Sequence, residues 1–465
     1  MDQSLEKKRL TVCPVAWHAQ RSPKLVAVET DEAQITFSEL HTILISLSLQ
    51  LAKLNMQKGD RLVSISTDNY VSVLLQLCCL RNGFIFCPIN PKFSQVEIKQ
   101  RLTRLNSHFI WQPGGEKSLD LDFSSPTSPA TVINAFKIDP YAVVSIIFTS
   151  GSTGIPKAVM HHYSNHYYSA LGSQSVIPLS SGDKNLLSLP MFHISGYATV
   201  IRSIIAGATI KVSNEKVSVK YLKKQKITHL SLVSTQLQKL LIDEKFYADS
   251  LSIKHLLLGG SAFPTKALQE TRKRGFNYHL SYGSTEMASQ IATSTNNEIL
   301  QLLPYRQLKI IDNEILLSGK TRFVGYFEGD AHKGLIDKEQ YVASSDIGEF
   351  SGKTVKINGR KDRQFISGGE NIQPEEVEKV LLSYPELSQA YVVPINDTIY
   401  GQRPVAFIKW NNGEKPNQLK EFIKDKLVSF KQPLHYFELP EQKGFKINTN
   451  KLSKLALQLL LKQQK

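Results

Sequence analysis

The sequence has 465 residues but only four cysteines, which are Cys13, Cys78, Cys79 and Cys87. Their spacing matches no metal-ligand motif, so a zinc-binding module built on cysteines is excluded. Cys78 and Cys79 stand inside the apolar stretch VLLQLCCL, which predicts reduced thiols in the hydrophobic core. We therefore assign no function to the cysteines.

Long hydrophobic segments are also missing. No apolar run is long enough to span a membrane, and the N-terminal MDQSLEKKRL lacks the apolar core of a signal peptide. No zinc-finger, helix-turn-helix or RNA-recognition signature is present. These absences lead us to expect a cytoplasmic protein without stable membrane insertion and without a nucleic-acid partner. They leave open whether it forms a homo-oligomer.

Acidic residues are outnumbered by basic ones, 41 to 56, which gives a net charge of +15. The basic residues are spread along the chain and form no arginine-rich tract. This distribution favours a cleft that collects small polyanionic substrates, although a basic, soluble surface without such a role explains it nearly as well.

The two common phosphate-binding motifs are absent from a loop with the composition of a phosphate site. This loop reads TSGSTGIPKAV from Thr149 to Val159 and follows an apolar, β-branched run, Ala142 to Ser150, that predicts a buried strand. The Walker motif needs a hydroxyl residue directly after its lysine, but Ala158 follows Lys157. The dinucleotide pattern G-x-G-x-x-G is also missing. The alternatives that remain are another use of ATP and a glycine-rich surface loop. After Lys157 the sequence gives a weak helix signal.

The pattern of hydrophobic residues predicts an α/β fold in two domains. Apolar residues make up 41% of the chain, enough for a large core. Up to about Ile291, short β-rich runs alternate with helical patterns, which predicts layered, mostly parallel sheets. Residues 302–359 resemble a small antiparallel or barrel-like unit. We place a domain boundary at Asp362, between an N-terminal domain, 1–362, and a small mobile α+β domain, 363–465, whose first helix starts at Pro374.

Four other stretches carry residues with useful chemistry, and each could also have an ordinary structural role. His193 in LPMFHISG is, taken alone, more often a packing residue than a catalytic one. Tyr282, Thr285 and Glu286 in LSYGSTEMASQ offer a ring for a purine, a hydroxyl and a carboxylate for Mg²⁺, or an ordinary turn. Asp346 could accept both hydroxyls of a ribose, and a lysine near the C-terminus, in GFKIN, could be a solvated charge.

The order of these stretches is more informative than any one of them. TSGSTGIPK, PMFH, YGSTE, SSD, GRKD and a late lysine in KI follow one another as in the acyl-adenylate-forming enzymes, and the chain resembles that superfamily over almost its whole length. Within it, the chain resembles the short o-succinylbenzoate–CoA ligases of γ-proteobacteria. The stretches that carry this resemblance are LLSLPMFHISGYATVIR, SLVSTQLQKLL, LLLGGSAFP, FISGGENIQPEEVE and LVSFKQPLHYFELP.

The resemblance implies roles for individual residues. The β- and γ-phosphates of ATP would be held by Thr149, Ser150, Ser152, Thr153 and Lys157. The adenine slot would be formed by Gly259, Gly260, Ser261 and Tyr282. Thr285 would contact the α-phosphate, and Glu286 would hold Mg²⁺. The ribose would be bound by Asp346 and Arg360. The acyl pocket would be lined by His193, Ser195, Arg202 and Ser231. Gly368 and Gly369 would line the CoA tunnel, Asp362 would be the hinge, and Lys446 would be the catalytic lysine of adenylation.

The sequence departs from the family pattern at two of these positions. The usual Thr-Gly-Asp is Ser344-Ser345-Asp346, and Phe445 interrupts the usual Gly-Lys pair before Lys446. We keep Lys446 as the catalytic lysine, with Lys443 and Lys451 as the other candidates.

The reaction that the resemblance implies is activation of 2-succinylbenzoate by ATP, followed by transfer to CoA, in menaquinone synthesis. Its small-molecule substrates would be 2-succinylbenzoate, ATP and CoA, with Mg²⁺ as cofactor. Another aryl- or acyl-CoA ligase is the nearest alternative, but its substrate would not need a partner such as Arg202 for a second carboxylate. A stand-alone adenylation domain and a non-catalytic nucleotide-binding relative are further alternatives.

Overall fold

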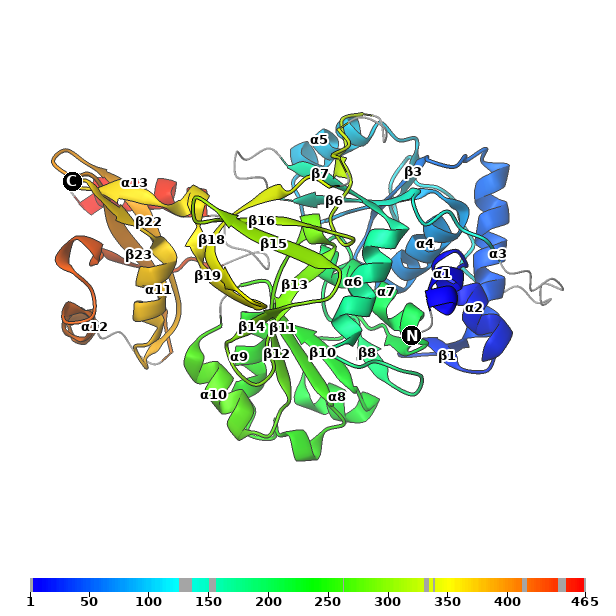
Figure 1. The fold of residues 1–465 in the computed structure, drawn as a ribbon, viewed down its shortest axis with the longest axis horizontal. Coiled ribbons are helices and arrows are strands. Elements are labelled where there is room, and N and C mark those ends of the chain that lie inside the picture. Colours follow the sequence, from blue (N-terminus) through cyan, green and yellow to red (C-terminus); the bar gives the residue numbers. More distant parts are fainter. Residues whose placement is uncertain are drawn as a thin grey trace.

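The computed structural model describes residues 3–124, 136–149, 156–261, 263–329, 334–337, 339–411, 416–441 and 449–463. Figure 1 shows a large N-terminal part and a smaller C-terminal part at the end of the molecule away from the N-terminus. The described residues form three sheets with helices packed against them, so the predicted mixed α/β class is confirmed. No described helix is long and apolar enough to cross a membrane.

The first sheet has the strand order β17-β7-β6-β4-β3-β5. Its strands are β3 (Arg61–Ile65), β4 (Ile85–Ile89), β5 (Phe109–Trp111), β6 (Val143–Thr149), β7 (Lys157–His162) and β17 (Gly325–Tyr326). Strands β3 to β6 are parallel, whereas β7 runs antiparallel to both β6 and β17. The helix signal after Lys157 was therefore wrong for its first residues, because they pair with β6 before the helix begins at Tyr163.

The second sheet has a parallel part that matches the predicted alternation of strands and helices. Its order is β12-β11-β10-β8-β9-β1, with β2 antiparallel at the edge. These strands are β1 (Val26–Glu29), β2 (Gln34–Thr36), β8 (Lys184–Leu186), β9 (Thr209–Lys211), β10 (His229–Leu232), β11 (His255–Gly259) and β12 (Tyr278–Ser284). Because parallel strands end at the same edge, the loops after β10, β11 and β12 are brought together.

The antiparallel strands predicted near residues 302–359 continue this second sheet beyond β12, in the order β13-β14-β19-β18-β16-β15. They are β13 (Ser289–Thr293), β14 (Leu300–Leu302), β15 (Arg306–Ile311), β16 (Glu314–Gly319), β18 (Val342–Ser351) and β19 (Thr354–Arg360). β18 and β19 pair in a register that sets Asp346 opposite Arg360. The third sheet belongs to the C-terminal part and contains β20 (Phe365–Ser367), β21 (Glu370–Ile372), β22 (Leu387–Asp397), β23 (Gly401–Trp410) and β24 (Tyr436–Glu438).

Several of the described helices begin at residues whose side chains cap them. α3 starts after Thr36 and α5 after Ser94, each with a capping box to a glutamate three residues later, and α11 starts at Pro374 as predicted. The helices of the N-terminal part are α1 (Gln3–Leu10), α2 (Pro14–Arg21), α3 (Phe37–Lys53), α4 (Asn69–Asn82), α5 (Gln95–Leu105), α6 (Tyr163–Gln174), α7 (Ile194–Ala206), α8 (Val219–Gln225), α9 (Ser234–Ile242) and α10 (Thr265–Lys273). Those of the C-terminal part are α11 (Pro374–Leu382), α12 (Pro416–Lys424) and α13 (Thr449–Gln463).

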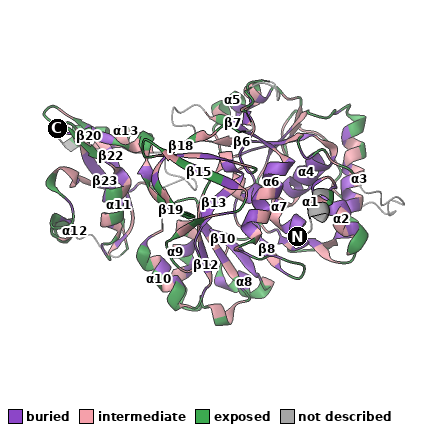
Figure 2. Ribbon diagram, viewed as in Figure 1, coloured by how far each residue is buried: buried purple, intermediate pink, exposed green. Residues whose placement is uncertain are grey.

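Separate hydrophobic cores stabilise the two parts. One large core joins α3, α4, α6 and α7 to the strands of the N-terminal part, and another packs α11 and α12 on β22 and β23. In Figure 2 the strands and helix α4 of the N-terminal part are largely buried, whereas α12 is mostly exposed. All four cysteines are buried free thiols, as predicted for Cys78 and Cys79. Burial raises the pKa of Cys78 to about 11, so this thiol is unreactive at neutral pH.

Candidate active site

The predicted phosphate loop connects two paired strands. Thr149 ends β6 and lies opposite Lys157, which begins β7, so these two residues are neighbours across the strand pair. Ser150, Ser152 and Thr153 lie outside the described residues. The Lys157 side chain is exposed, and its Nζ lies 5.1 Å from the centroid of the Tyr326 ring.

Tyr326 links Lys157 to Glu286, and the sequence analysis did not identify it. Its hydroxyl donates a hydrogen bond of 3.4 Å to Oε1 of Glu286. Burial, together with the nearby Glu286 carboxylate, raises the pKa of Tyr326, so the phenol remains a donor at neutral pH. No sequence signal marks this tyrosine, because its place depends on the pairing of β17 with β7.

The backbone carbonyl groups of Thr285 and Glu286 are held by hydrogen bonds from buried residues. Both lie in a short 3-10 turn, Thr285–Met287, that follows β12. Nε2 of His161 donates to the Thr285 carbonyl oxygen at 2.7 Å, and the Phe323 amide donates to the Glu286 carbonyl oxygen at 2.6 Å. Burial lowers the pKa of His161 to about 4, so it is a neutral imidazole. The turn is therefore held in place by buried groups.

Glu286 fits the requirements of a magnesium ligand. Mg²⁺ is usually held by one or two carboxylates together with water and substrate phosphates. The single hydrogen bond to Glu286 Oε1 leaves its other carboxylate oxygen without a side-chain donor among the described residues. These residues contain no cluster of three or more metal-ligating side chains, so a metal here would need phosphate oxygens as additional ligands.

Asp346 lies at the centre of a hydrogen-bonded cluster that joins three predicted site residues. The Tyr282 hydroxyl donates to its Oδ2 at 2.5 Å, and Nη1 of Arg360 donates to its Oδ1 at 3.1 Å. Burial raises the pKa of Asp346, while these two donors oppose that shift. Burial and the adjacent carboxylate raise the pKa of Tyr282 well above its usual value.

Arg360 also contacts the residue predicted to be the hinge. Its Nε and Nη2 donate to the two carboxylate oxygens of Asp362 at 3.0 and 2.9 Å. The pKa of Arg360 is raised above its usual value, and the largest cause is this bidentate pair with Asp362. A single guanidinium therefore connects Asp346 with Asp362, which lies in the short turn between β19 and β20.

The residues predicted for the adenine slot lie on neighbouring strands. Gly259 ends β11 and pairs with Ser281, the residue before Tyr282 on β12. Gly260 follows with a φ of +89°, a conformation that favours glycine, and Ser261 is exposed. The structure thus brings Gly259, Gly260 and Ser261 to the strand next to Tyr282.

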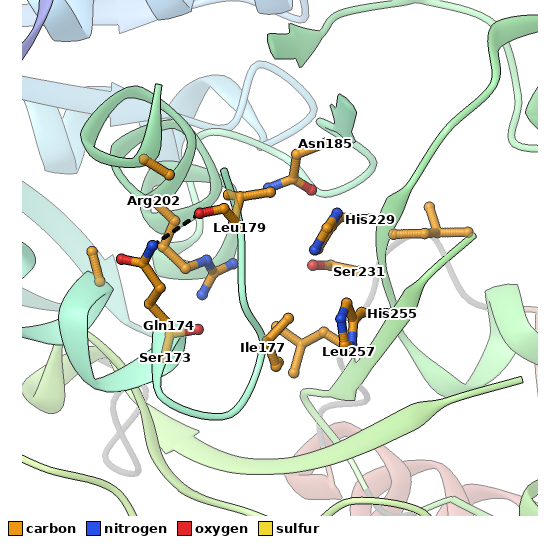
Figure 3. Close-up of a pocket in the computed structure, with 13 residues that line it drawn as sticks. Ser173, Gln174, Ile177, Leu179, Asn185, Arg202, His229, Ser231, His255 and Leu257 are labelled. Carbon is orange, nitrogen blue, oxygen red and sulfur yellow. Dashed lines mark hydrogen bonds between the residues drawn. The ribbon is translucent and has the colours of Figure 1, made fainter. Parts of the chain in front are cut away.

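A pocket lies between helices α6 and α7 and strands β10 and β11, and it encloses about 420 Å³ of empty space, part of it open to solvent. Arg202 from α7 and Ser231 from β10 both line it, as Figure 3 shows. His193 and Ser195 lie at the start of α7 and do not line this pocket. Of the four residues predicted to line the acyl pocket, two therefore lie in this cavity.

Arg202 has only neutral partners among the described residues. Its Nη1 donates to Oε1 of Gln290 at 3.2 Å, and its Nη2 donates to Oγ1 of Thr199 at 3.2 Å. Burial lowers the pKa of Arg202 to about 10, so the guanidinium is still charged at neutral pH. A buried charge without an anionic partner is costly, and an anionic ligand would offset that cost.

The residues predicted for CoA binding lie in the C-terminal part. Gly368 and Gly369 follow β20 with φ values of +58° and +88°. A Cβ on Gly368 would lie 2.9 Å from the Tyr400 ring, whereas one on Gly369 would meet no atom within 4 Å. Both positive φ values favour glycine. A side chain at position 368 would also have to displace the exposed Tyr400 ring, whereas Gly369 faces open space. Lys446 and Lys443 lie outside the described residues, and Lys451 is an exposed residue of α13.

The sequence of this protein matches a known family of enzymes over both parts of the molecule. The model of the AMP-binding enzyme family matches residues 15–321, and the model of the AMP-binding enzyme C-terminal domain matches residues 376–445. The chain belongs to the AMP-binding enzyme family and is an AMP-forming ligase. Among curated members it is similar to the 2-succinylbenzoate–CoA ligase of Escherichia coli, with 33% identity over 96% of this chain and 98% of that protein.

Two solved structures extend this similarity to the fold. An arginine-to-lysine variant of Escherichia coli MenE with bound OSB-AMS is 30% identical and has a TM-score of 0.84, over 96% of this chain and 98% of that one. The o-succinylbenzoate coenzyme A synthetase (MenE) of Bacillus subtilis, in complex with ATP and magnesium ion, is 27% identical and has a TM-score of 0.82. That comparison covers 95% of this chain and 99% of the other.

Proposed function

We propose that this chain activates 2-succinylbenzoate with ATP to form an acyl adenylate, and then transfers the acyl group to CoA. The products are 2-succinylbenzoyl-CoA, AMP and pyrophosphate, and the step belongs to menaquinone biosynthesis. The observation that carries this proposal is Arg202, a charged guanidinium in a pocket where its described partners are neutral. A dicarboxylic acid reacts through one carboxylate and would pair with Arg202 through the other. The curated relatives carry the same substrate in their names.

In the first half-reaction, one carboxylate of the substrate attacks the α-phosphate of ATP and pyrophosphate leaves. Two anions must approach each other, so the chain's main task is to position them and to neutralise charge. Lys157 and the loop from Thr149 would hold the β- and γ-phosphates, and Thr285 would contact the α-phosphate. Mg²⁺ at Glu286 would supply further charge neutralisation. Asp346 would accept the ribose hydroxyls, because Tyr282 and Arg360 orient its carboxylate.

In the second half-reaction, the CoA thiol attacks the acyl carbon and AMP leaves. We propose that residues 363–465 rotate about Asp362 between the two steps. This motion would withdraw Lys446 from the adenylate and bring Gly368 and Gly369 beside the pantetheine path. We place the reaction in the cytoplasm.

The experiment that tests the proposal is ATP–pyrophosphate exchange across a panel of aromatic mono- and dicarboxylic acids. We expect exchange to be fastest with 2-succinylbenzoate. Faster exchange with an aromatic monocarboxylate would overturn the assignment of 2-succinylbenzoate as the substrate. Exchange with none of the acids would overturn the proposed activity. Adding CoA or a carrier protein as acceptor then separates a CoA ligase from a carrier-loading domain.

A further inference from the structure

Three histidines lie side by side on the sheet below the acyl pocket, and the proposed reaction uses none of them. They are His229 on β10, His255 on β11 and His279 on β12. His229 and His255 are register partners, and each neighbouring pair of rings has centroids 5.1 Å apart. Two of the three, His229 and His255, line the same pocket as Arg202.

The position of the proton on His255 follows from its hydrogen-bond partners. The Tyr278 amide donates to Oδ1 of Asn296, so Nδ2 of Asn296 donates to Oδ1 of Asn277. Nδ2 of Asn277 is therefore the group that faces Nδ1 of His255, at 3.1 Å. Because an amide nitrogen only donates, Nδ1 of His255 must accept. Burial lowers the pKa of His255, so the ring is neutral at neutral pH and its single proton is on Nε2.

The other two histidines have their ring nitrogens occupied. Nε2 of His229 donates to the Pro178 carbonyl oxygen at 2.8 Å, and its Nδ1 lies 2.9 Å from Oγ1 of Thr228. His279 is almost fully buried and lies between His255 and Thr295, at 2.9 and 3.0 Å. Among the described residues, only His255 of these three has an Nε2 proton without an acceptor.

The lining of the pocket favours an anion. No aspartate or glutamate is among the described residues that line it. Arg202 stands on one side, and His229, Ser231 and His255 stand on the opposite side (Figure 3). A carboxylate between these walls would have one oxygen toward a charged donor and the other toward a neutral one.

We infer that His255 is a second specificity-determining residue, whose Nε2–H donates to the distal carboxylate of the substrate opposite Arg202. This inference rests on the proposed function, because it takes 2-succinylbenzoate as the acid that fills the pocket. His279 and Asn277 act as positioning residues, since their hydrogen bonds to Nδ1 keep the proton of His255 on the pocket side.

The test compares two conservative variants of His255. The amide of glutamine can take the place of Nε2, so His255→Gln keeps a donor in the pocket. The shorter amide of asparagine takes the place of Nδ1, so His255→Asn keeps the contacts to Asn277 and His279 but removes the pocket donor. The readout is kcat/KM for 2-succinylbenzoate over that for its distal mono-ester, in ATP–pyrophosphate exchange. Both acids are measured on one preparation, so unfolded protein cancels from the ratio.

We expect His255→Asn to lower the acid-over-ester ratio about tenfold or more, because a hydrogen bond to a charged group is stronger than one to an ester. His255→Gln should retain most of the ratio. If the wild type is active and the acid-over-ester ratio is the same in all three proteins, the role of His255 is overturned while the proposed function stands. An equal fall of the ratio in both variants also overturns the role of His255. A wild type that exchanges with other acids but not with 2-succinylbenzoate overturns the proposed substrate, and this inference with it.

Discussion

At the residue scale, the pocket that contains Arg202 is characterised by an imbalance of charge. Arg202 is charged, its hydrogen-bond partners Gln290 and Thr199 are neutral, and the described pocket lining contains no carboxylate. Arg202 and Ser231 were named from the sequence because both lie in motifs of the family, and both line this pocket; their role in binding the acyl group stays a prediction. The sequence did not predict His229 and His255, because a histidine in an apolar strand is more often a packing residue, and only the parallel register places the two together.

Replacing Arg202 should therefore change substrate preference more than general activity. Truncating one partner of a buried charge pair costs about 2–5 kcal/mol. For Arg202→Leu this corresponds to a loss of about 30-fold to several thousandfold in kcat/KM for 2-succinylbenzoate. The distal mono-ester does not form the pair, so the acid-over-ester ratio should fall steeply. Arg202→Lys is the matched control, because it keeps the charge but loses the guanidinium fork. An unchanged ratio in Arg202→Leu would show that another group binds the carboxylate.

A second residue-scale prediction concerns Ser345, which stands where the family usually has glycine. Its φ is +61°, a left-handed conformation that costs a residue with a Cβ about 1–2 kcal/mol. Ser345→Gly relieves this strain at some entropic cost, so we expect the melting temperature to rise by about 1–2 °C. Ser344→Gly should lower it, because the Ser344 hydroxyl donates to the Ile315 carbonyl oxygen and accepts from the Asp346 amide. Thermal unfolding that ranks the two variants in the opposite order would contradict this account.

At the scale of secondary-structure elements, the sequence predicted where strands occur better than it predicted which strands pair with one another. The runs that contain β3, β4, β6 and β8 to β11 are short and rich in apolar residues, and all form strands. β7 was missed because Lys157–His162 has no period of two, and its conformation is decided by pairing with β6. The strand pairs that build the site, such as β17 with β7, depend on long-range contacts that local patterns do not contain.

The short turn between β19 and β20 is the element on which the hinge prediction depends. Arg360 holds Asp362 by two hydrogen bonds in the present arrangement. Asp362→Pro removes this pair and fixes φ near −65°, so it should hold one arrangement of the two domains. We expect one half-reaction to survive and the other to collapse, measured as pyrophosphate exchange and as thioester formation from a supplied acyl adenylate. Asp362→Ala, which removes the pair without fixing φ, should affect both far less. A proline variant with both rates unchanged would exclude Asp362 as the hinge.

At the scale of the whole molecule, the proposed reaction requires two arrangements of one chain. The C-terminal part has a core of its own, built by α11, α12, β22 and β23, which allows it to move as a unit. The described hydrogen bonds between the two parts include one from Nε2 of Gln238 to the Ser388 carbonyl oxygen at 3.3 Å and one from Nε2 of Gln373 to the Arg360 carbonyl oxygen at 3.0 Å. Polar contacts of this kind can be exchanged when domains reorient during a reaction cycle.

Lys446 gives a whole-molecule prediction because it should serve only one of the two arrangements. Lys446→Ala should abolish formation of the acyl adenylate and largely spare thioester formation from supplied adenylate. The matched controls are Lys443→Ala and Lys451→Ala, which should leave adenylation largely intact. If Lys451→Ala or Lys443→Ala gives the split and Lys446→Ala does not, the catalytic lysine is at that other position.

The most direct test of the central claim is product formation by the purified wild-type protein. ATP, Mg²⁺, CoA and 2-succinylbenzoate are incubated with the enzyme, and the CoA thioester and adenine nucleotides are quantified by liquid chromatography and mass spectrometry. The account predicts 2-succinylbenzoyl-CoA and AMP in equal amounts, with no ADP and with little thioester when an aromatic monocarboxylate replaces the dicarboxylate. Formation of ADP, or a monocarboxylate thioester made faster than 2-succinylbenzoyl-CoA, would contradict it.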